Sequence, residues 1–304
     1  MTALPADAAL EAAPELDARG QWARARRRFL RHRLAMVGLL GLVVVFGGGI
    51  FAPQLAPYRY EAIDLTKVLT APTTAGGHYF GTDEIGRDYL SRILFGIRTS
   101  EQVGLFVAGV GTAFGLLVGA VAGFYRGWVD NILMRAIDLI LTIPGPVVLL
   151  TVAALLAGRG DNLWTISFLL AGFASTQIAR IIRGQVLSLR EKEYVEAARA
   201  VGAGDIRIIV RHIFPNMLGP IVVAGTLAVA DAIVAESYLS FLGFGVKPPT
   251  PSLGNLLSDG RQFPQDWWLT VLPGLVLVLI VICVNFLGDA LRDALDPQQR
   301  RVRA

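Results

Sequence analysis

The stretch "EYVEAARAVGAGDIRIIVRHIFPN", Glu193–Asn216, is charged and helix-prone, and long apolar runs flank it on both sides. Apolar residues recur at helical spacing in its first half, and Gly202 and Gly204 end that pattern. Asp205 is a suitable N-cap for a second short helix, which Pro215 would close. We therefore expect two short amphipathic helices, which either dock on a partner protein or lie on lipid headgroups.

The composition of the whole chain points to lipid as part of its solvent. Of its 304 residues, 54% are hydrophobic and only 17% are charged, whereas soluble domains carry about 25% charged residues. The single cysteine, Cys283, lies in an apolar run and is interpreted as a packing residue. This composition predicts an integral membrane protein.

The apolar runs predict how often the chain crosses the membrane. A helix needs about 20 mostly apolar residues to span a bilayer, and the sequence has six such runs without the alternating pattern of a membrane barrel. The first run is too long for a signal peptide. We expect an all-α integral membrane protein whose six transmembrane helices are Leu34–Tyr58, Gln102–Tyr125, Leu139–Gly158, Asn162–Ala179, His212–Ala230 with an extension to about Ser240, and Trp267–Gly288.

The basic residues predict the orientation of these spans. With a cytoplasmic N-terminus, 20 of the 28 Lys and Arg residues lie inside and 8 outside, as the positive-inside rule requires. The arginine-rich stretch Arg24–Arg33 is then a topology anchor on anionic lipid rather than a nucleic-acid patch. The predicted segments are a cytoplasmic segment 1–33, a first span with an outer segment 34–100, a membrane core 101–290 with the loop 180–215, and a cytoplasmic tail 291–304.

The opening stretch resembles the cytoplasmic loop signature of ABC-importer permeases. The signature is Glu-Ala-Ala, a Gly four residues after the second Ala, and a terminal Pro; it departs from the general pattern in having His and Phe before that Pro. In that family the loop inserts into a groove on the ATPase subunit and transmits its movement. The resemblance implies ATPase-coupling roles for Glu196, Ala197, Ala198, Gly202 and Pro215.

Four further stretches resemble one branch of that family, the C-type permease subunits of dipeptide, oligopeptide and nickel importers. The resemblance runs from about Arg27 to Pro297, with Leu253 standing where the family often has Trp. The stretches are "HYFGTDEIGRDYLSRILFGIRTS" (His78–Ser100), "AIDLILTIP" (Ala136–Pro144), "AESYLSFLGFGVKPPTPSLGN" (Ala235–Asn255) and "NFLGDALRDALDP" (Asn285–Pro297).

The resemblance implies a fold, a function and a set of partners. The fold would be that of a type I ABC importer permease, with both termini and the coupling helices in the cytoplasm. The chain would be a non-catalytic permease subunit in the bacterial inner membrane, lining a pathway for di- or oligopeptides or related solutes. Its partners would be a homologous permease in a heterodimer, two ABC ATPase subunits, an extracytoplasmic solute-binding protein and membrane lipid, but no nucleic acid. Peptides, nickel complexes and opines all remain open as cargo.

The residues themselves indicate that the motor is elsewhere. A phosphate-cradling loop needs Gly-Lys-Ser/Thr, and no lysine of this chain follows a glycine. We therefore expect no cofactor in this chain, with ATP and Mg on partner ATPase subunits. The alternative is a self-contained secondary transporter or channel whose loop lies on lipid; that class needs coupling carboxylates or an inverted repeat, and no convincing repeat is present.

Three residues inside the spans are candidates for pathway or gating roles. Pro144 in "TIPGP" interrupts the third span, and broken helices often line a substrate path. Asp231 and Glu236 are carboxylates in or near the fifth span, where charge is costly and normally faces a cavity or a partner. Contact with the ammonium group of a substrate is one interpretation, and a structural or gating role for Glu236 is favoured over it.

Other patterns favour structure over chemistry. Glycines at every fourth position of the second span allow close helix packing, which is favoured over a sliding surface. The acidic "GTDEIGRD" lacks calcium-loop spacing and predicts a capped, salt-bridged helix start. The three histidines lie on different sides of the predicted membrane and offer no metal or catalytic set.

The orientation is testable by cysteine labelling in intact cells, with Cys283 replaced. An impermeant thiol reagent is expected to label Thr74→Cys, which is predicted to be outside, and to leave Ser188→Cys unlabelled until the cells are opened, because the basic residues concentrate on its side. The reverse pattern would overturn the predicted topology.

Overall fold

The computed structural model describes residues 26–74, 76–156 and 163–295, and within these ranges the protein is helical, with one isolated β-bridge and no strand. The predicted boundaries Gly158 and Asn162, and the predicted terminal segments over 1–25 and 296–304, lie outside the described residues. The elements are α2 (Arg33–Ile50), α3 (Ala52–Leu55), the 3₁₀ turn η2 (Leu65–Lys67), α4 (Tyr89–Tyr125), α5 (Gly127–Thr142), α6 (Gly145–Leu156), α7 (Leu163–Leu189), α8 (Glu193–Ala200), α9 (Asp205–Ile208), the π-helical segment η3 (Ile209–Ile213), α10 (Phe214–Phe241), α11 (Leu253–Gly260) and α12 (Trp268–Leu295).

The number of crossings agrees with the six predicted spans. Five helical stretches of the described chain are long and apolar enough to cross a membrane: α2, α4, α7, α12 and the run from α9 to α10. A sixth crossing is formed if α5 and α6 count as one, and these two helices are bent by 90° relative to each other. Pro144 lies in that break, so the predicted interruption of the third span is confirmed.

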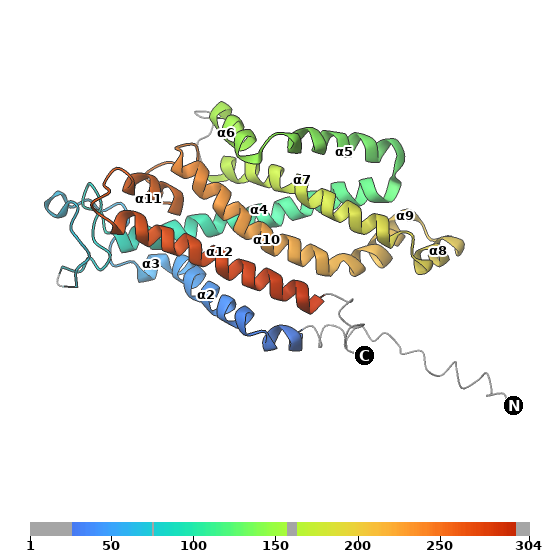
Figure 1. Cartoon of the computed structure of the whole chain (residues 1–304), viewed down its shortest axis with the longest axis horizontal. Coiled ribbons are helices and arrows are strands. Elements are labelled where there is room, and N and C mark those ends of the chain that lie inside the picture. The colour runs from blue at the N-terminus through green and yellow to red at the C-terminus, as the bar shows by residue number, and fades with distance from the viewer. Residues whose placement is uncertain (1–25, 75, 157–162, 296–304) are drawn as a thin grey trace.

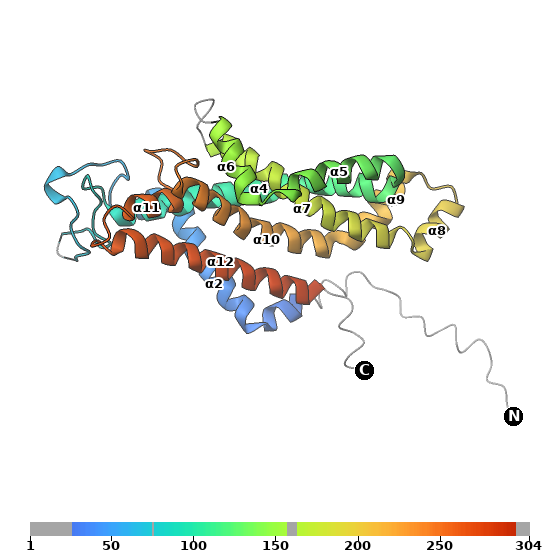
Figure 2. The same cartoon turned by 45° about the horizontal axis from the view of Figure 1, so that its top comes forward.

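The long helices lie side by side, with α10 between α12 and α7 and crossing over α4 (Figure 1; Figure 2). Helices α8 and α9 lie at one end of this bundle, which we call the loop end. Helices α3 and α11 and the connection 56–88 lie at the other, which we call the cap end. The first residues of α2 and the last residues of α12 point toward the loop end. The described chain therefore enters and leaves the bundle on the side of the predicted coupling loop.

Helix α4 is longer than the predicted second span because its polar start is neutralised by neighbours. It begins at Tyr89 rather than Gln102. Asp88 caps it by accepting a hydrogen bond from the Ser91 backbone N–H at 2.8 Å. The buried Arg92 guanidinium pairs with the Asp83 carboxylate at 2.7 Å. The predicted capped, salt-bridged helix start is thus confirmed.

The prediction that Pro215 ends a second short helix is wrong. Helix α9 continues through η3 into α10, so that Asp205–Phe241 is one helical run of 37 residues. Pro215 lies at the second residue of α10, inside this run, and has no N–H to donate to the preceding turn. The wider π turn just before it keeps the chain helical, with the Phe214 N–H bonded to the Ile209 carbonyl. The N-cap of α9 is Gly204, one residue before the predicted Asp205.

Helices α4 and α7 touch through their backbones along the predicted glycine stripe. A Cβ atom built on Gly115 would lie 2.7 Å from the Ile178 Cβ, and one on Gly123 would lie 2.9 Å from the Arg183 carbonyl oxygen. In lipid no hydrophobic effect drives two apolar helices together, so small residues that allow such contact decide which helices pair. The predicted packing role of the stripe is confirmed.

The contact predicts opposite effects for two glycine-to-alanine changes in α4. Gly119→Ala would place its Cβ against the Ala179 carbonyl and 2.9 Å from the Ile182 Cβ, so we expect a loss of about 1–3 kcal/mol in unfolding free energy. Gly109→Ala meets no atom within 4 Å and should leave stability equal or up to about 1 kcal/mol higher. Thermal unfolding of the purified variants in one detergent measures both. Equal melting temperatures would contradict the packing role.

Candidate functional site

The predicted coupling loop is a pair of short helices fixed to the loop end of the bundle. Val195 and Ala198 of α8 are buried and share a hydrophobic cluster with Ile208 of α9 and Ile213 of η3. Ala198 therefore packs inside its own chain, whereas Ala197 points outward and is exposed. Ala198 thus packs α8 against the rest of the chain, and the small side chain of Ala197 leaves space on the outer side of α8.

Three large apolar residues are exposed on this helix pair and the segment after it, among exposed charged residues such as Glu193, Arg199 and Arg207. The side chains of Val201, Ile206 and Val210 are 85%, 75% and 61% exposed, and we call these three residues the loop patch. Glu196 is also exposed and has no partner in the described chain. Val201 belongs to the first half of the stretch, where apolar residues recur at helical spacing. Ile206 and Val210 were not predicted to be exposed, although their spacing of four residues on one helical run could have shown them.

The turn between α8 and α9 depends on one glycine. Gly202 has φ +79°, and no atom lies within 4 Å of the position of a Cβ. The constraint there is therefore conformational and not steric. Gly204 has φ −70° and equally open surroundings, so any residue could take its place.

Two arginines join the loop to the end of α4. Arg190 and Arg199 lie over the ring of the buried Phe124 at 5.8 Å and 5.6 Å from its centroid, and Arg190 also donates to the Phe124 carbonyl oxygen. Burial lowers the pKa of Arg190, and the nearby positive charge of Arg126 lowers it further. Arg126 in turn pairs with Glu191 at 3.0 Å. Helix α8 and the residues before it are therefore joined to the end of α4 by packed, charged contacts.

Glu236 joins three segments at the cap end. Its carboxylate is fully buried and accepts hydrogen bonds from the Ser100 hydroxyl of α4 at 2.9 Å and from the Ser240 hydroxyl at 2.6 Å. The Ser240 oxygen also accepts from the Val246 N–H of the following connection at 3.0 Å. Glu236 therefore holds α10 against α4, and no surface for a substrate exists at this carboxylate.

A second polar contact holds α11 in the cap. The Arg92 guanidinium, already paired with Asp83, also reaches the Asp259 carboxylate of α11 at 3.5 Å. Burial raises the pKa of the Asp259 carboxyl, and the positive charge of Arg92 opposes that shift. The cap is thus a network of buried and half-buried charges that fixes the ends of α4, α10 and α11 together.

Asp231 differs from Glu236 although both belong to α10. Its side chain is exposed, and it has no hydrogen-bond or ion-pair partner within the described chain. Pro144, the third pathway candidate, lies between α5 and α6 and is itself exposed. The structure thus separates the two predicted carboxylates into one structural group and one unpaired group.

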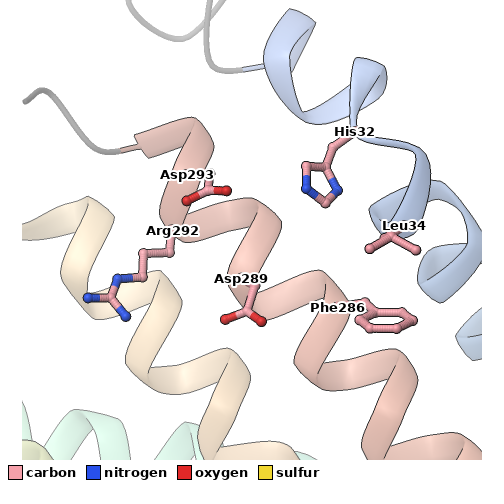
Figure 3. A pocket seen from close by; sticks show the side chains of 6 residues that line it. All are labelled: His32, Leu34, Phe286, Asp289, Arg292 and Asp293. Carbon is pink, nitrogen blue, oxygen red and sulfur yellow. The ribbon is translucent and has the colours of Figure 1, made fainter. Parts of the chain in front are cut away.

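A pocket lies toward the loop end between the start of α2 and the end of α12 (Figure 3). His32 at its rim caps α2, since its Nδ1 accepts a hydrogen bond from the Ala35 N–H at 3.2 Å. Among the described residues, no group of His, Cys, Asp and Glu side chains is arranged to hold a metal ion, and this pocket is no exception. Its lining residues are His32, Leu34, Phe286, Asp289, Arg292 and Asp293.

Two family models match parts of the sequence that together make up most of the chain. Residues 115–301 match the family model described as binding-protein-dependent transport system inner membrane component. Residues 20–72 match the N-terminal TM domain of oligopeptide transport permease C. The two matches do not overlap, and together they cover an N-terminal part and the larger C-terminal part of the chain.

Curated relatives align over nearly their whole length. The oligopeptide transport system permease protein OppC of Mycobacterium tuberculosis (strain H37Rv) is 41% identical over 278 residues, covering 91% of this chain and 94% of the relative. The proteins of the same name from Haemophilus influenzae and Escherichia coli K12 are 40% and 41% identical over 287 residues, covering 94% of this chain and 91% and 94% of the relatives. A chain of the MetNI methionine ABC transporter, solved in inward facing conformations, shares the fold with a TM-score of 0.56 at 20% identity, over 67% of this chain and 96% of its own length.

The turn of the loop gives a matched pair of variants. Gly202→Ala must keep φ near +79°, which costs about 1 kcal/mol and should speed hydrogen exchange of the α8 backbone amides about fivefold. Gly204→Ala is the control and should change exchange little, because its φ of −70° suits any residue. Hydrogen exchange with mass spectrometry over residues 190–210 measures both. Equal exchange in the two variants would contradict a conformational role for Gly202.

Proposed function

Because this chain belongs to the family of binding-protein-dependent transport system inner membrane components, we propose that it forms, with a homologous permease, a membrane pathway for oligopeptides. The chain is the permease subunit of an ABC importer and a multi-pass protein of the inner membrane. Such a permease works with ATPase subunits and a solute-binding protein, so the alternative of a self-contained secondary transporter or channel does not apply. The names of the curated relatives support oligopeptides as the cargo.

The proposed assembly has this chain and a homologous permease as a heterodimer within membrane lipid. Both termini and the loop end face the cytoplasm, and the cap end faces the solute-binding protein. Two facts support this orientation: the excess of basic residues on the loop side, and the position of both described chain ends toward that side. ATP and Mg are held by the two ATPase subunits, and this chain contributes no catalytic group.

The loop patch is the observation that supports the coupling role most strongly. Apolar side chains as exposed as Val201 and Ile206 are unfavourable in water, and patches of this kind mark interaction sites. We propose that the patch enters an apolar groove of the ATPase subunit. Ala197 leaves room for the wall of that groove. The Glu196 carboxylate, which has no partner in the described chain, pairs with a basic or amide group of the ATPase. Gly202 and Pro215 act indirectly, through the turn and through the start of α10.

The helical run from α9 to α10 gives the loop a mechanical route to the cap end. Its 37 residues correspond to about 55 Å at 1.5 Å per residue. When ATP closes the two ATPase subunits, the loops of the two permeases are drawn together and the pathway opens outward; hydrolysis resets it. The transition is a population shift between two states of the assembly, in which Pro144 and the Glu236 contacts serve as gating elements.

The coupling role is tested on the assembled transporter in cells that lack their own peptide importer. Val201→Glu and Ile206→Glu place charge in the proposed groove, and each loses about 1.5–3 kcal/mol of apolar burial. Uptake of a labelled tripeptide and copurification of the ATPase subunits should both fall about tenfold or more. The folded membrane helices should be unaffected, because both side chains are exposed in this chain.

The control is Leu65→Glu at the cap end. Leu65 is an apolar residue that is 72% exposed, similar to Ile206 of the loop patch. It should retain ATPase subunits at the wild-type level. If the two loop-patch variants also retain ATPase and uptake, the loop does not dock as proposed. If the wild-type transporter retains its ATPase subunits but takes up no tripeptide, oligopeptides are rejected as the cargo.

A further inference from the structure

Helix α10 carries one carboxylate that the structure uses and one that it leaves free. Glu236 is buried and bonded to Ser100 and Ser240. Asp231, five residues earlier, is exposed and has no hydrogen-bond or ion-pair partner in the part of the chain that the structure describes. The packing of the fold therefore gives no reason for a carboxylate at position 231.

The depth of Asp231 makes an unpaired charge there costly. It lies 10 residues before the end of α10 at Phe241 and 17 residues after its start at Phe214. At 1.5 Å per residue these spacings are about 15 Å and about 26 Å, which places Asp231 within the roughly 30 Å hydrocarbon layer. Carboxylates at this depth face water or a partner and not lipid tails.

Helix α10, which carries Asp231, packs next to α6 of the broken span. Val234 and Tyr238 share the face of α10 that holds Asp231, at spacings of three and seven residues, and Val234 is exposed as well. Tyr238, and Ala232 next to Asp231 in the sequence, belong to the same packed cluster as Leu149 of α6. Helix α6 follows the 90° bend after α5, and broken helices of this kind line substrate paths in transporters.

We propose that Asp231 lines the translocation pathway and binds the positively charged amino terminus of a peptide in transit. This inference rests on the proposed oligopeptide cargo and adds a residue to it. The carboxylate would be the one charged group that α10 presents to the pathway, since Glu236 is enclosed by α4 and by the residues that follow α10.

The chemistry of the cargo fits such a group. A free α-amino group has a pKa of about 7.7–8.0 and is therefore mostly an ammonium at neutral pH. An ammonium and a carboxylate form a charge-assisted hydrogen bond that does not depend on the side chains of the peptide. A single such contact also suits transit, because a site on a pathway must release its ligand as well as accept it.

The test uses the complete transporter with its ATPase subunits and binding protein. Asp231→Asn should lower uptake of trialanine about tenfold at subsaturating concentration, Asp231→Glu should stay within about threefold of wild type, and all variants should retain ATPase and the homologous permease. The matched control is Asp289→Asn, which removes from α12 another exposed carboxylate without a partner among the described residues and should leave uptake unchanged. In a Cys283→Ala background, Asp231→Cys should react with a water-soluble thiol reagent.

The other outcomes are distinct. Wild-type uptake by Asp231→Asn would reject the ammonium contact. Loss of the homologous permease from that variant would identify Asp231 as a subunit contact instead. An unreactive Asp231→Cys would place the residue against lipid and overturn the pathway assignment. If the wild-type transporter takes up no trialanine, the proposed cargo fails, and the thiol reaction still decides whether position 231 lines the pathway.

Discussion

The direct backbone contact between α4 and α7 is the constraint on which the bundle depends. Lipid tails are as apolar as the helix surfaces, so the pairing of these two helices needs close approach, and the glycines facing Ile178 and Arg183 provide it. Helix α4 is also connected to the cap end, through the ion pair of Arg92 with Asp83, and to the loop, through the contact of Phe124 with Arg199. Every other described span, the broken one included, packs on this pair directly or through α10.

The same arrangement explains how a short surface loop can act across a membrane. Its two helices are tied to the bundle at two places: Arg199 rests on Phe124 at the end of α4, and α9 runs without a stop into α10. At the far end of α10, Glu236 is bonded to Ser100, again on α4. Movement of the loop relative to α4 must therefore appear as a change at the Glu236 contacts or as bending in between, and the π segment beside Pro215 is the least regular part of that route.

Much of this could be predicted from hydropathy and local signals, and the failures have physical causes. The spans, the break at Pro144 and the glycine packing follow from periodicity, proline chemistry and residue size. The true start of α4 was missed because a hydropathy count treats Arg92 as a penalty, although the Asp83 carboxylate in the turn just before the helix neutralises it. The different surroundings of Asp231 and Glu236 could not be foreseen, because one helical turn decides which of them meets Ser100.

The exposed loop patch also bears on how the protein fares before it is assembled. A newly inserted copy without an ATPase subunit would hold Val201, Ile206 and Val210 in water, at a tip that the bundle does not cover. Such a surface invites self-association and recognition by chaperones and proteases, which act on exposed apolar residues. Docking of the motor would hide it. The amount of this permease in a cell would then follow the supply of its ATPase partner, and surplus copies would be removed.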